Sequence, residues 1–401
     1  MDIRKNLLWN TVGSIFYSMC QWVITIIVVY VASYEDAGYL SLAMTMSSSF
    51  SAISLFSMRN FQVSDVRGEF ATTQYVSSRI WTCGIAFTVC AFCAVFGNST
   101  YQMLCIDAFM FLRVAEAMAD VLHGVNQKHD RYNLIGISYI LRGIITVGVF
   151  SFGLLLVDNL WLILFLMAGM NFLVVVCFDW KQTGKLEAIK INLKEREIVE
   201  LLKKCVPLVI FSFLLSLENL IPKDVLKLCY DTETLGIYST IASPVLVVQL
   251  FASVVFSPFL PKFSQIYNDG KIDVFRKLLH KVYMFLGIFG VVVSVGAMLL
   301  GRWGLRLLLG ESILDYYYLF MPIVFTALLT GIVWIISAIV ILLRKIKALL
   351  IAILADFVIC VIITYPIISG FGANGVSIVQ IISLSILALF LIAICEREAR
   401  R

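Results

Sequence analysis

Three charged side chains recur at helical spacing in one otherwise apolar segment, Phe111–Gly124. Arg113, Glu116 and Asp120 fall at about 0°, 300° and 340° around a helix, so they share one face. An ionised side chain in the middle of a membrane costs several kcal/mol unless it is paired or hydrated. The sequence therefore predicts that these three side chains face the protein interior, with His123 extending the same face.

Two interpretations of this charged face stay open. Arg113 can pair with Glu116 at i+3, and Arg142, on the next hydrophobic segment, reaches a similar depth and could pair with Glu116 or Asp120. The face would then be a neutralised salt-bridge cluster that locks two helices together. In the other interpretation it lines a hydrated cavity, where Arg113 attracts an anionic group of a substrate or the carboxylates carry protons.

A stripe of polar residues runs along the first hydrophobic segment. Successive members are 4, 4, 3 and 4 residues apart, which places them within an arc of about 80°. Such a stripe either forms hydrogen bonds between helices, each worth roughly 1 kcal/mol or less, or lines a polar cavity. Its length favours the cavity. The stripe consists of Asn10, Ser14, Ser18, Gln21 and Thr25.

A similar stripe opens the second half of the chain. It is made of Ser212, Ser216, Asn219 and Lys223, and Pro222 can kink the helix there. Glu218 on this segment and Asp356 further along the chain are additional acids inside hydrophobic runs, each a structural partner or a functional group. The cations available to an anionic substrate are Arg59, Arg113, Arg142 and Lys223.

The composition indicates an integral membrane protein. Of 401 residues, 61% are hydrophobic and only 14% charged, whereas soluble domains are about half apolar and a quarter charged. The hydrophobic runs are about 20 residues long, enough to cross roughly 30 Å of hydrocarbon as helices. The predicted fold is all-α, with twelve transmembrane helices at about 7–33, 37–57, 79–97, 100–122, 133–157, 159–179, 205–222, 235–258, 281–301, 315–343, 347–369 and 374–395.

The basic residues predict the orientation of these spans. With a cytoplasmic N-terminus, 26 of the 31 Lys and Arg lie in or beside cytoplasmic segments, as the positive-inside rule requires. An even number of spans places both termini in the cytoplasm. Because the net charge of +5 follows from topology, we expect no nucleic acid as a partner.

The longest polar connection divides the predicted spans into six and six. The sequence predicts lobes at 1–180 and 205–401, joined by a cytoplasmic linker at 181–204. Tyr34–Ala43 and Tyr230–Ala242 echo each other at corresponding positions of the two halves, as in transporters built from repeats. The linker's apolar residues predict an amphipathic helix on the membrane surface; they are Ile191, Ile198, Leu201 and Leu202.

Several motifs of enzymes and cofactor sites are missing or misplaced. The chain has no GxxxxGK[ST] phosphate loop, and the GxGxxG at Gly370–Gly375 falls at a predicted turn between membrane helices. Cys90 and Cys93 form an isolated CxxC within a hydrophobic run and are expected to be inert thiols. The sequence contains no metal-ligand cluster and no pairing of a nucleophile with a base. We therefore expect neither a cofactor nor an enzyme.

Three segments resemble one transporter family. Thr232–Lys271 is similar to the segment of polysaccharide exporters with Gly-x-Tyr-Ser, an apolar helix and Leu-Pro-x-Phe-Ser. Arg113–Asn133 resembles their fourth helix and inner loop, and the part from Ile341 resembles their last two helices. The chain thus resembles Wzx-type lipid-linked oligosaccharide flippases of the multidrug/oligosaccharidyl-lipid/polysaccharide exporter (MOP) superfamily, to which the multidrug transporters called MATE also belong.

This resemblance implies both a fold and a function. Two six-helix lobes would form a MATE-like V with a pseudo-twofold axis and a cavity opening alternately to each side. The substrate would be an undecaprenyl-diphosphate-linked oligosaccharide, flipped across the bacterial cytoplasmic (inner) membrane for polysaccharide or O-antigen synthesis, with the polymerase machinery as an expected partner. Polar stripes and buried cations suit such a substrate, because a diphosphate cannot cross hydrocarbon unaided.

Two other functions remain as alternatives. A drug/cation antiporter of the same superfamily would use a carboxylate-centred cation site, for which Glu116, Asp120, Glu218 and Asp356 are candidates. A membrane glycan polymerase or ligase would also have many spans. Such enzymes carry a large outer loop, whereas the longest outer connection predicted here, about Lys223–Thr234, has a dozen residues. The enzyme is therefore the less favoured alternative.

Overall fold

The computed structural model describes residues 3–64, 69–192, 196–245, 263, 266–267 and 269–400, and within them all regular structure is helical. The chain forms two compact units, Met1–Ser216 (unit 1) and Leu217–Arg401 (unit 2). The division falls inside one long helix. Each unit is described by itself, and the predicted lobe boundaries at 180 and 205 stay predictions.

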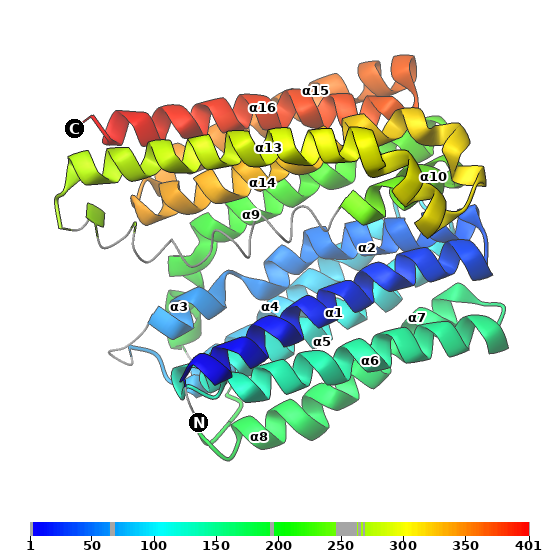
Figure 1. Ribbon diagram of the computed structural model, residues 1–401. Coiled ribbons are helices and arrows are strands. Elements are labelled where there is room, and N and C mark those ends of the chain that lie inside the picture. Colours follow the sequence, from blue (N-terminus) through cyan, green and yellow to red (C-terminus); the bar gives the residue numbers. More distant parts are fainter. Residues whose placement is uncertain are drawn as a thin grey trace. The chain divides into compact units, whose positions relative to one another are not determined.

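Unit 1 is a bundle built around helix α5, which packs against α2, α4 and α7 (Figure 1). Many side chains of α5 are fully buried, among them Phe109, Leu112 and Leu122. Central burial explains why α5 can carry charges without exposing them to lipid. The elements of unit 1 are α1 (Ile3–Val31), α2 (Tyr34–Leu55), α3 (Met58–Ser64), α4 (Thr72–Ala94), α5 (Thr100–Lys128), α6 (Tyr132–Leu156), α7 (Leu160–Val174), a π-helix (Val175–Trp180), α8 (Lys181–Thr183) and the first part of α9 (Arg196–Cys229).

Helices α1 and α6 approach each other closely at two glycines. A Cβ atom added to Gly13 would lie 2.5 Å from the carbonyl oxygen of Gly136, and one added to Gly136 would lie 2.3 Å from that of Trp9. Membrane helices associate closely where small residues let their backbones meet. This contact fixes α1 alongside α6 and turns the other faces of α1 toward α2 and α5.

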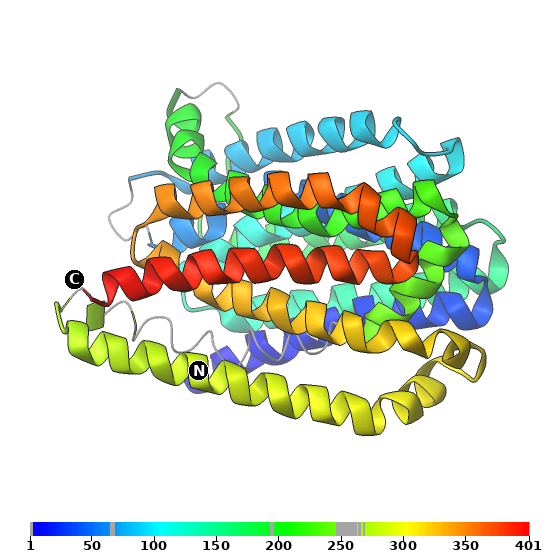
Figure 2. The same ribbon diagram turned by 90° about the horizontal axis from the view of Figure 1, so that it is seen from above.

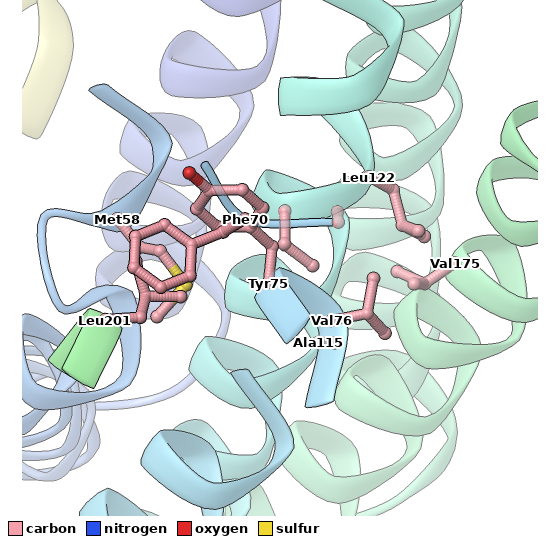
Figure 3. Close-up of a cluster of buried hydrophobic side chains, with 10 residues drawn as sticks. Met58, Phe70, Tyr75, Val76, Ala115, Leu122, Val175 and Leu201 are labelled. Atoms are coloured by element: carbon pink, nitrogen blue, oxygen red, sulfur yellow. The ribbon is translucent and has the colours of Figure 1, made fainter. Parts of the chain in front are cut away.

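A hydrophobic cluster closes unit 1 near the start of α4, where Met58, Phe70, Tyr75 and Leu201 meet (Figure 3). Leu201 belongs to the segment for which we predicted a surface helix. In the structure, α9 starts at Arg196 and continues without a break to Cys229. Near its start Ile198 and Leu201 are buried in the protein, whereas Val199 is exposed, and the surface helix stays a prediction.

Unit 2 consists of the second part of α9 and helices that run back and forth beside it (Figure 2). Helix α16 packs against both α14 and α15. The turn at 370–375 joins α15 to α16, with Gly372 at a φ of 59°, so the predicted role of this GxGxxG as a tight turn is confirmed. The elements are α10 (Thr232–Ala242), a 3-10 turn (Ser243–Val245), α13 (Ile272–Leu309), a 3-10 segment (Ser312–Leu319), α14 (Phe320–Leu342), α15 (Ile346–Phe371) and α16 (Ala373–Glu398).

The protein is a multi-pass membrane protein. Among the described residues, eight helices are long and apolar enough to cross a membrane. The predicted spans at 37–57, 100–122 and 205–222 coincide with α2, α5 and α9, which carry more polar residues. The predicted span at 235–258 begins with α10, and its second half lies outside the described residues.

Candidate functional site

The centre of unit 1 holds an ion pair that α1 and α2 help to position. Nη1 of Arg113 lies 2.6 Å from a carboxylate oxygen of Glu116, and both side chains are largely buried. From α1, the Tyr17 hydroxyl and Nε2 of Gln21, the latter at 2.6 Å, donate to the other oxygen. Nη2 of Arg113 donates to Ser48 Oγ on α2 at 2.9 Å. The prediction that Arg113 and Glu116 face the interior is confirmed.

One turn further along α5, Asp120 is held by two arginines. Nη1 of Arg59, on α3, lies 3.2 Å from one carboxylate oxygen, and Nη2 of Arg79, on α4, lies 3.0 Å from the other. Arg79 is completely buried and also donates to the backbone oxygen of Ser54. Asp120 thus joins three helices. The expectation that Arg142 could pair with Asp120 is wrong, because Arg59 and Arg79 occupy both carboxylate oxygens.

Arg142 instead lies between two aromatic rings. Its guanidinium carbon is 4.9 Å from the ring centre of Tyr17 and 5.1 Å from that of Tyr139. Such cation–π contacts stabilise a desolvated guanidinium by about 2 kcal/mol. The side chain is 1% exposed, and its Nε and Nη1 atoms have no hydrogen-bond partner among the described residues. Arg142 therefore retains unused hydrogen-bond donors inside unit 1.

A third carboxylate, Asp179, is buried in the π-helix that follows α7. It accepts a hydrogen bond from Ser138 Oγ at 2.9 Å, and its other oxygen is 3.2 Å from Nε2 of His123. A π-helix changes the direction of side chains locally and often marks a functional position. Here it turns Asp179 toward α5 and α6, where it partly offsets the charge of Arg142.

These clusters make the interior of unit 1 rich in guanidinium groups. Four arginines are gathered with three carboxylates along α5 and the helices around it, namely Arg59, Arg79, Arg113 and Arg142 with Glu116, Asp120 and Asp179. In a medium of low dielectric constant, an excess of one sign of charge attracts counter-ions strongly. This arrangement suits the binding of an anionic group.

The polar stripe of α1 contributes one side chain, Gln21, to this cluster. Gln21 reaches Glu116 and Arg113. Ser14 and Thr25 donate to backbone oxygens of their own helix, and Asn10 and Ser18 are partly exposed. In the described contacts, most side chains of the stripe therefore form no hydrogen bond with a neighbouring helix. Its assignment to a cavity wall stays a prediction.

Unit 2 contains two acids that face each other. Glu218 on α9 and Asp356 on α15 are almost fully buried, and their carboxyl groups interact electrostatically. Ser383 Oγ on α16 donates to Asp356 at 3.1 Å. Neither oxygen of Glu218 receives a hydrogen bond from a donor group in the described part of the chain. Two buried carboxylates in contact repel each other, so a proton or another cation between them would relieve the repulsion.

The other candidates in unit 2 have structural contacts. Nε2 of Gln380 on α16 donates to Oδ1 of Asn219 at 3.0 Å, which is the interhelical hydrogen bond expected of a polar stripe. Lys223 is partly buried one turn further along α9. Within the described ranges, no three His, Cys, Asp or Glu side chains are placed to hold a metal ion.

The chain was compared with known proteins. No model of a protein family matches the sequence. The capsular polysaccharide biosynthesis protein CapF of Staphylococcus aureus is 29% identical over 314 residues, which are 77% of this chain and 78% of CapF. The chain is thus similar to a capsular polysaccharide biosynthesis protein over three quarters of its length. The resemblance to polysaccharide exporters that the sequence predicted is thereby confirmed.

Solved structures agree with the predicted fold. The lipid II flippase MurJ, in an inward closed conformation, has a TM-score of 0.72 and 14% identity, covering 98% of this chain and 90% of that one. A MATE-family multidrug transporter of the MOP superfamily, in an inward-facing conformation, has a TM-score of 0.64 and 13% identity, covering 98% of this chain and 96% of that one. At these identities the similarity establishes the fold alone. The fold is the all-α, MATE-like membrane fold.

Sequence reasoning missed four residues of the unit 1 site: Arg79, Asp179, Tyr17 and Tyr139. Arg79 was placed at the edge of a span, because hydropathy windows avoid charges, whereas α4 begins at Thr72. Asp179 was assigned to the end of another span for the same reason. The two tyrosines gave no signal, because nothing in the sequence distinguishes them from the others among the 16 tyrosines of the chain. Tyr17 does lie one residue from the α1 stripe, and that position could have suggested its role.

Proposed function

We propose that this protein moves a lipid-linked oligosaccharide across the bacterial cytoplasmic membrane for polysaccharide synthesis. Homology to a capsular polysaccharide biosynthesis protein supports the pathway, and similarity to MurJ supports a flippase fold. The arginine-rich interior of unit 1 is the observation that carries the proposal. We infer an undecaprenyl-diphosphate-linked repeat unit as the substrate, moved from the cytoplasmic to the outer leaflet by alternating access, with both termini in the cytoplasm.

Guanidinium groups match the chemistry of such a substrate. A diphosphate carries charges that hydrocarbon excludes, and an arginine binds phosphate oxygens through two parallel N–H donors. Arg113 is less than one-fifth exposed, and Arg142 has donors without partners among the described residues. The carbohydrate would meet polar side chains such as those of the α1 stripe, while the lipid tail stays in the bilayer.

The contacts of Glu116 suggest how substrate binding could change the conformation. In the present conformation Glu116 forms an ion pair with Arg113 and accepts hydrogen bonds from Tyr17 and Gln21 of α1. A phosphate group that binds Arg113 would compete with Glu116. Because Glu116 also holds α1, this competition would loosen α1 from α5, and binding would favour a second conformation through its differential contacts.

Replacement of Arg113 tests this proposal. Arg113→Ala should reduce surface polysaccharide at least tenfold, while the amount of protein in the membrane stays normal. Arg113→Lys should retain part of the activity, because it keeps the charge but loses the paired donors. Arg302→Ala, an exposed position at the far end of α13, is the control. Normal polysaccharide in cells carrying Arg113→Ala would contradict the role of Arg113.

A second candidate function is cation-coupled antiport of drugs. The buried pair of Glu218 and Asp356 favours it, because two acids in contact are suited to hold a proton or another cation. A deletion strain should then become more sensitive to cationic drugs, and Glu218→Gln should not restore resistance. Unchanged drug resistance together with loss of surface polysaccharide would exclude this candidate.

A further inference from the structure

One end of unit 2 is strongly basic. The start of α13, the turn between α14 and α15 and the end of α16 meet there, and in both views the start of α13 lies beside the C-terminus (Figures 1 and 2). Nine basic residues and four acidic ones gather at this end within the described residues. The basic residues are Lys271, Arg276, Lys277, Lys281, Arg344, Lys345, Lys347, Arg397 and Arg400.

A cavity of about 630 Å³ opens between the first turn of α13 and the end of α16. Its walls include three cations, Lys271, Arg276 and Arg400, and one acid, Asp273. The volume lies within the range of small-molecule sites, roughly 300 to 1,000 Å³. A group that fills the cavity would therefore touch cationic side chains from the start of α13 and from Arg400, just after the end of α16, which are more than a hundred residues apart in the sequence.

Neighbouring ion pairs leave the two arginines of this cavity available. Three of the four acids at this end have other basic partners: Asp269 pairs with Lys271 at 3.1 Å, Glu398 with Lys345 at 2.9 Å and Glu396 with His280 at 3.6 Å. Within the described part of the chain, neither Arg276 nor Arg400 forms an ion pair. Guanidinium groups without carboxylate partners are ready to bind phosphate.

The position of the cavity indicates that the phosphate belongs to a lipid. The apolar part of α13 begins about two turns beyond Arg276, and its outward side chains, such as Met284 and Ile288, are exposed where lipid would cover them. Val274, in the cavity wall, is 48% exposed. Cations next to an exposed apolar side chain at the end of a membrane helix match the headgroup and glycerol region of an anionic phospholipid.

We propose that this cavity binds the headgroup of an anionic phospholipid through Arg276 and Arg400, and that the bound lipid fastens the start of α13 to the end of α16. The site lies within unit 2 and is independent of which substrate the protein transports. The lipid acts as a structural ligand of the membrane-embedded protein.

The test uses the purified full-length protein in detergent with added phosphatidylglycerol or phosphatidylcholine. Phosphatidylglycerol should raise the thermal unfolding midpoint of the wild type, and phosphatidylcholine should raise it less. Arg276→Gln combined with Arg400→Gln should lose at least half of the shift produced by phosphatidylglycerol. Lys281→Gln combined with Lys347→Gln removes the same charge from the same end outside the cavity, and it should keep the shift.

Other outcomes would overturn the proposal. Equal loss of the shift in both double variants would mean that only the overall charge matters, and no loss in either would mean that the cavity binds no anionic lipid. A shift that inorganic phosphate reproduces would identify a free anion as the ligand instead of a lipid. If the double variant does not fold, Arg276→Lys and native mass spectrometry of bound phosphatidylglycerol decide, with fewer bound lipids expected in the variant.

Discussion

The two units of this protein place opposite kinds of charge in their interiors. Around α5 in unit 1, arginines gather about carboxylates, and each carboxylate has a donor: Glu116 has Arg113, and Asp120 has Arg59 and Arg79. In unit 2, Glu218 and Asp356 interact with each other, and among the described residues the pair accepts a hydrogen bond from the Ser383 hydroxyl alone. The same residue type therefore has opposite electrostatic surroundings in the two units.

This difference indicates separate tasks for buried charges in one membrane protein. A carboxylate that pairs with guanidinium groups offsets the cost of burying their charge, until a stronger anion competes for them. A carboxyl pair without cationic partners is instead ready to hold a proton or a cation. We therefore expect anion recognition to depend on unit 1, and any dependence of transport on a cation to depend on unit 2.

The largest expected effect comes from Asp120→Asn in unit 1. The neutral amide leaves Arg79, which is completely buried, without its charged partner. Breaking a buried ion pair in this way should destabilise the protein by about 3 kcal/mol. The thermal unfolding midpoint of the purified protein in detergent is the measurement. An unchanged midpoint would mean that Arg79 and Arg59 do not depend on Asp120.

The matched change in unit 2, Glu218→Gln, should not destabilise the protein in this way. Removing one charge from two carboxyl groups in contact relieves repulsion, and the amide can donate a hydrogen bond to Asp356. Stability should stay within about 1 kcal/mol of the wild type or increase. The same unfolding assay, run beside Asp120→Asn, measures this contrast. A large loss of stability would show that the Glu218 carboxylate has a cationic partner.

The smallest expected effect lies at the polar edge of unit 1, outside the membrane. Glu187 receives hydrogen bonds from Thr72 and from His129, the latter at 2.7 Å. Burial would raise the pKa of Glu187, but these hydrogen bonds outweigh it and hold the pKa below its usual value. A carboxyl group whose pKa is lowered by folding stabilises the protein above its unfolded pKa, about 4.3.

That stabilisation should disappear as the pH falls through the lowered pKa of Glu187. Glu187→Gln should therefore reduce the unfolding midpoint slightly at pH 7 and have no effect at a pH low enough to protonate Glu187 in the folded protein. Glu200→Gln, which removes an exposed carboxylate from the start of α9, is the control. An equal effect of Glu187→Gln at both pH values would show that the Glu187 contacts do not depend on its charge.

The sequence by itself determined the fold class and the inward direction of α5. Long apolar runs can satisfy their backbone groups in a membrane only as helices, and charges spaced at i, i+3 and i+7 must turn away from lipid. These two arguments predicted the helices and the burial of Arg113 and Glu116. The resemblance of scattered motifs to polysaccharide exporters was likewise readable in the sequence, and homology to CapF confirms it.

Only the tertiary structure decided which charges pair. Hydropathy marks a charged residue as the edge of a span, so it missed that Arg79 and Asp179 lie well inside the protein. A choice among Arg59, Arg79 and Arg142 as partners of Asp120 depends on helix contacts that no local pattern specifies. The start of α9 shows the same dependence on packing: an apolar face looks the same in sequence whether protein or lipid covers it, and only the neighbouring helices show that protein covers Ile198 and Leu201.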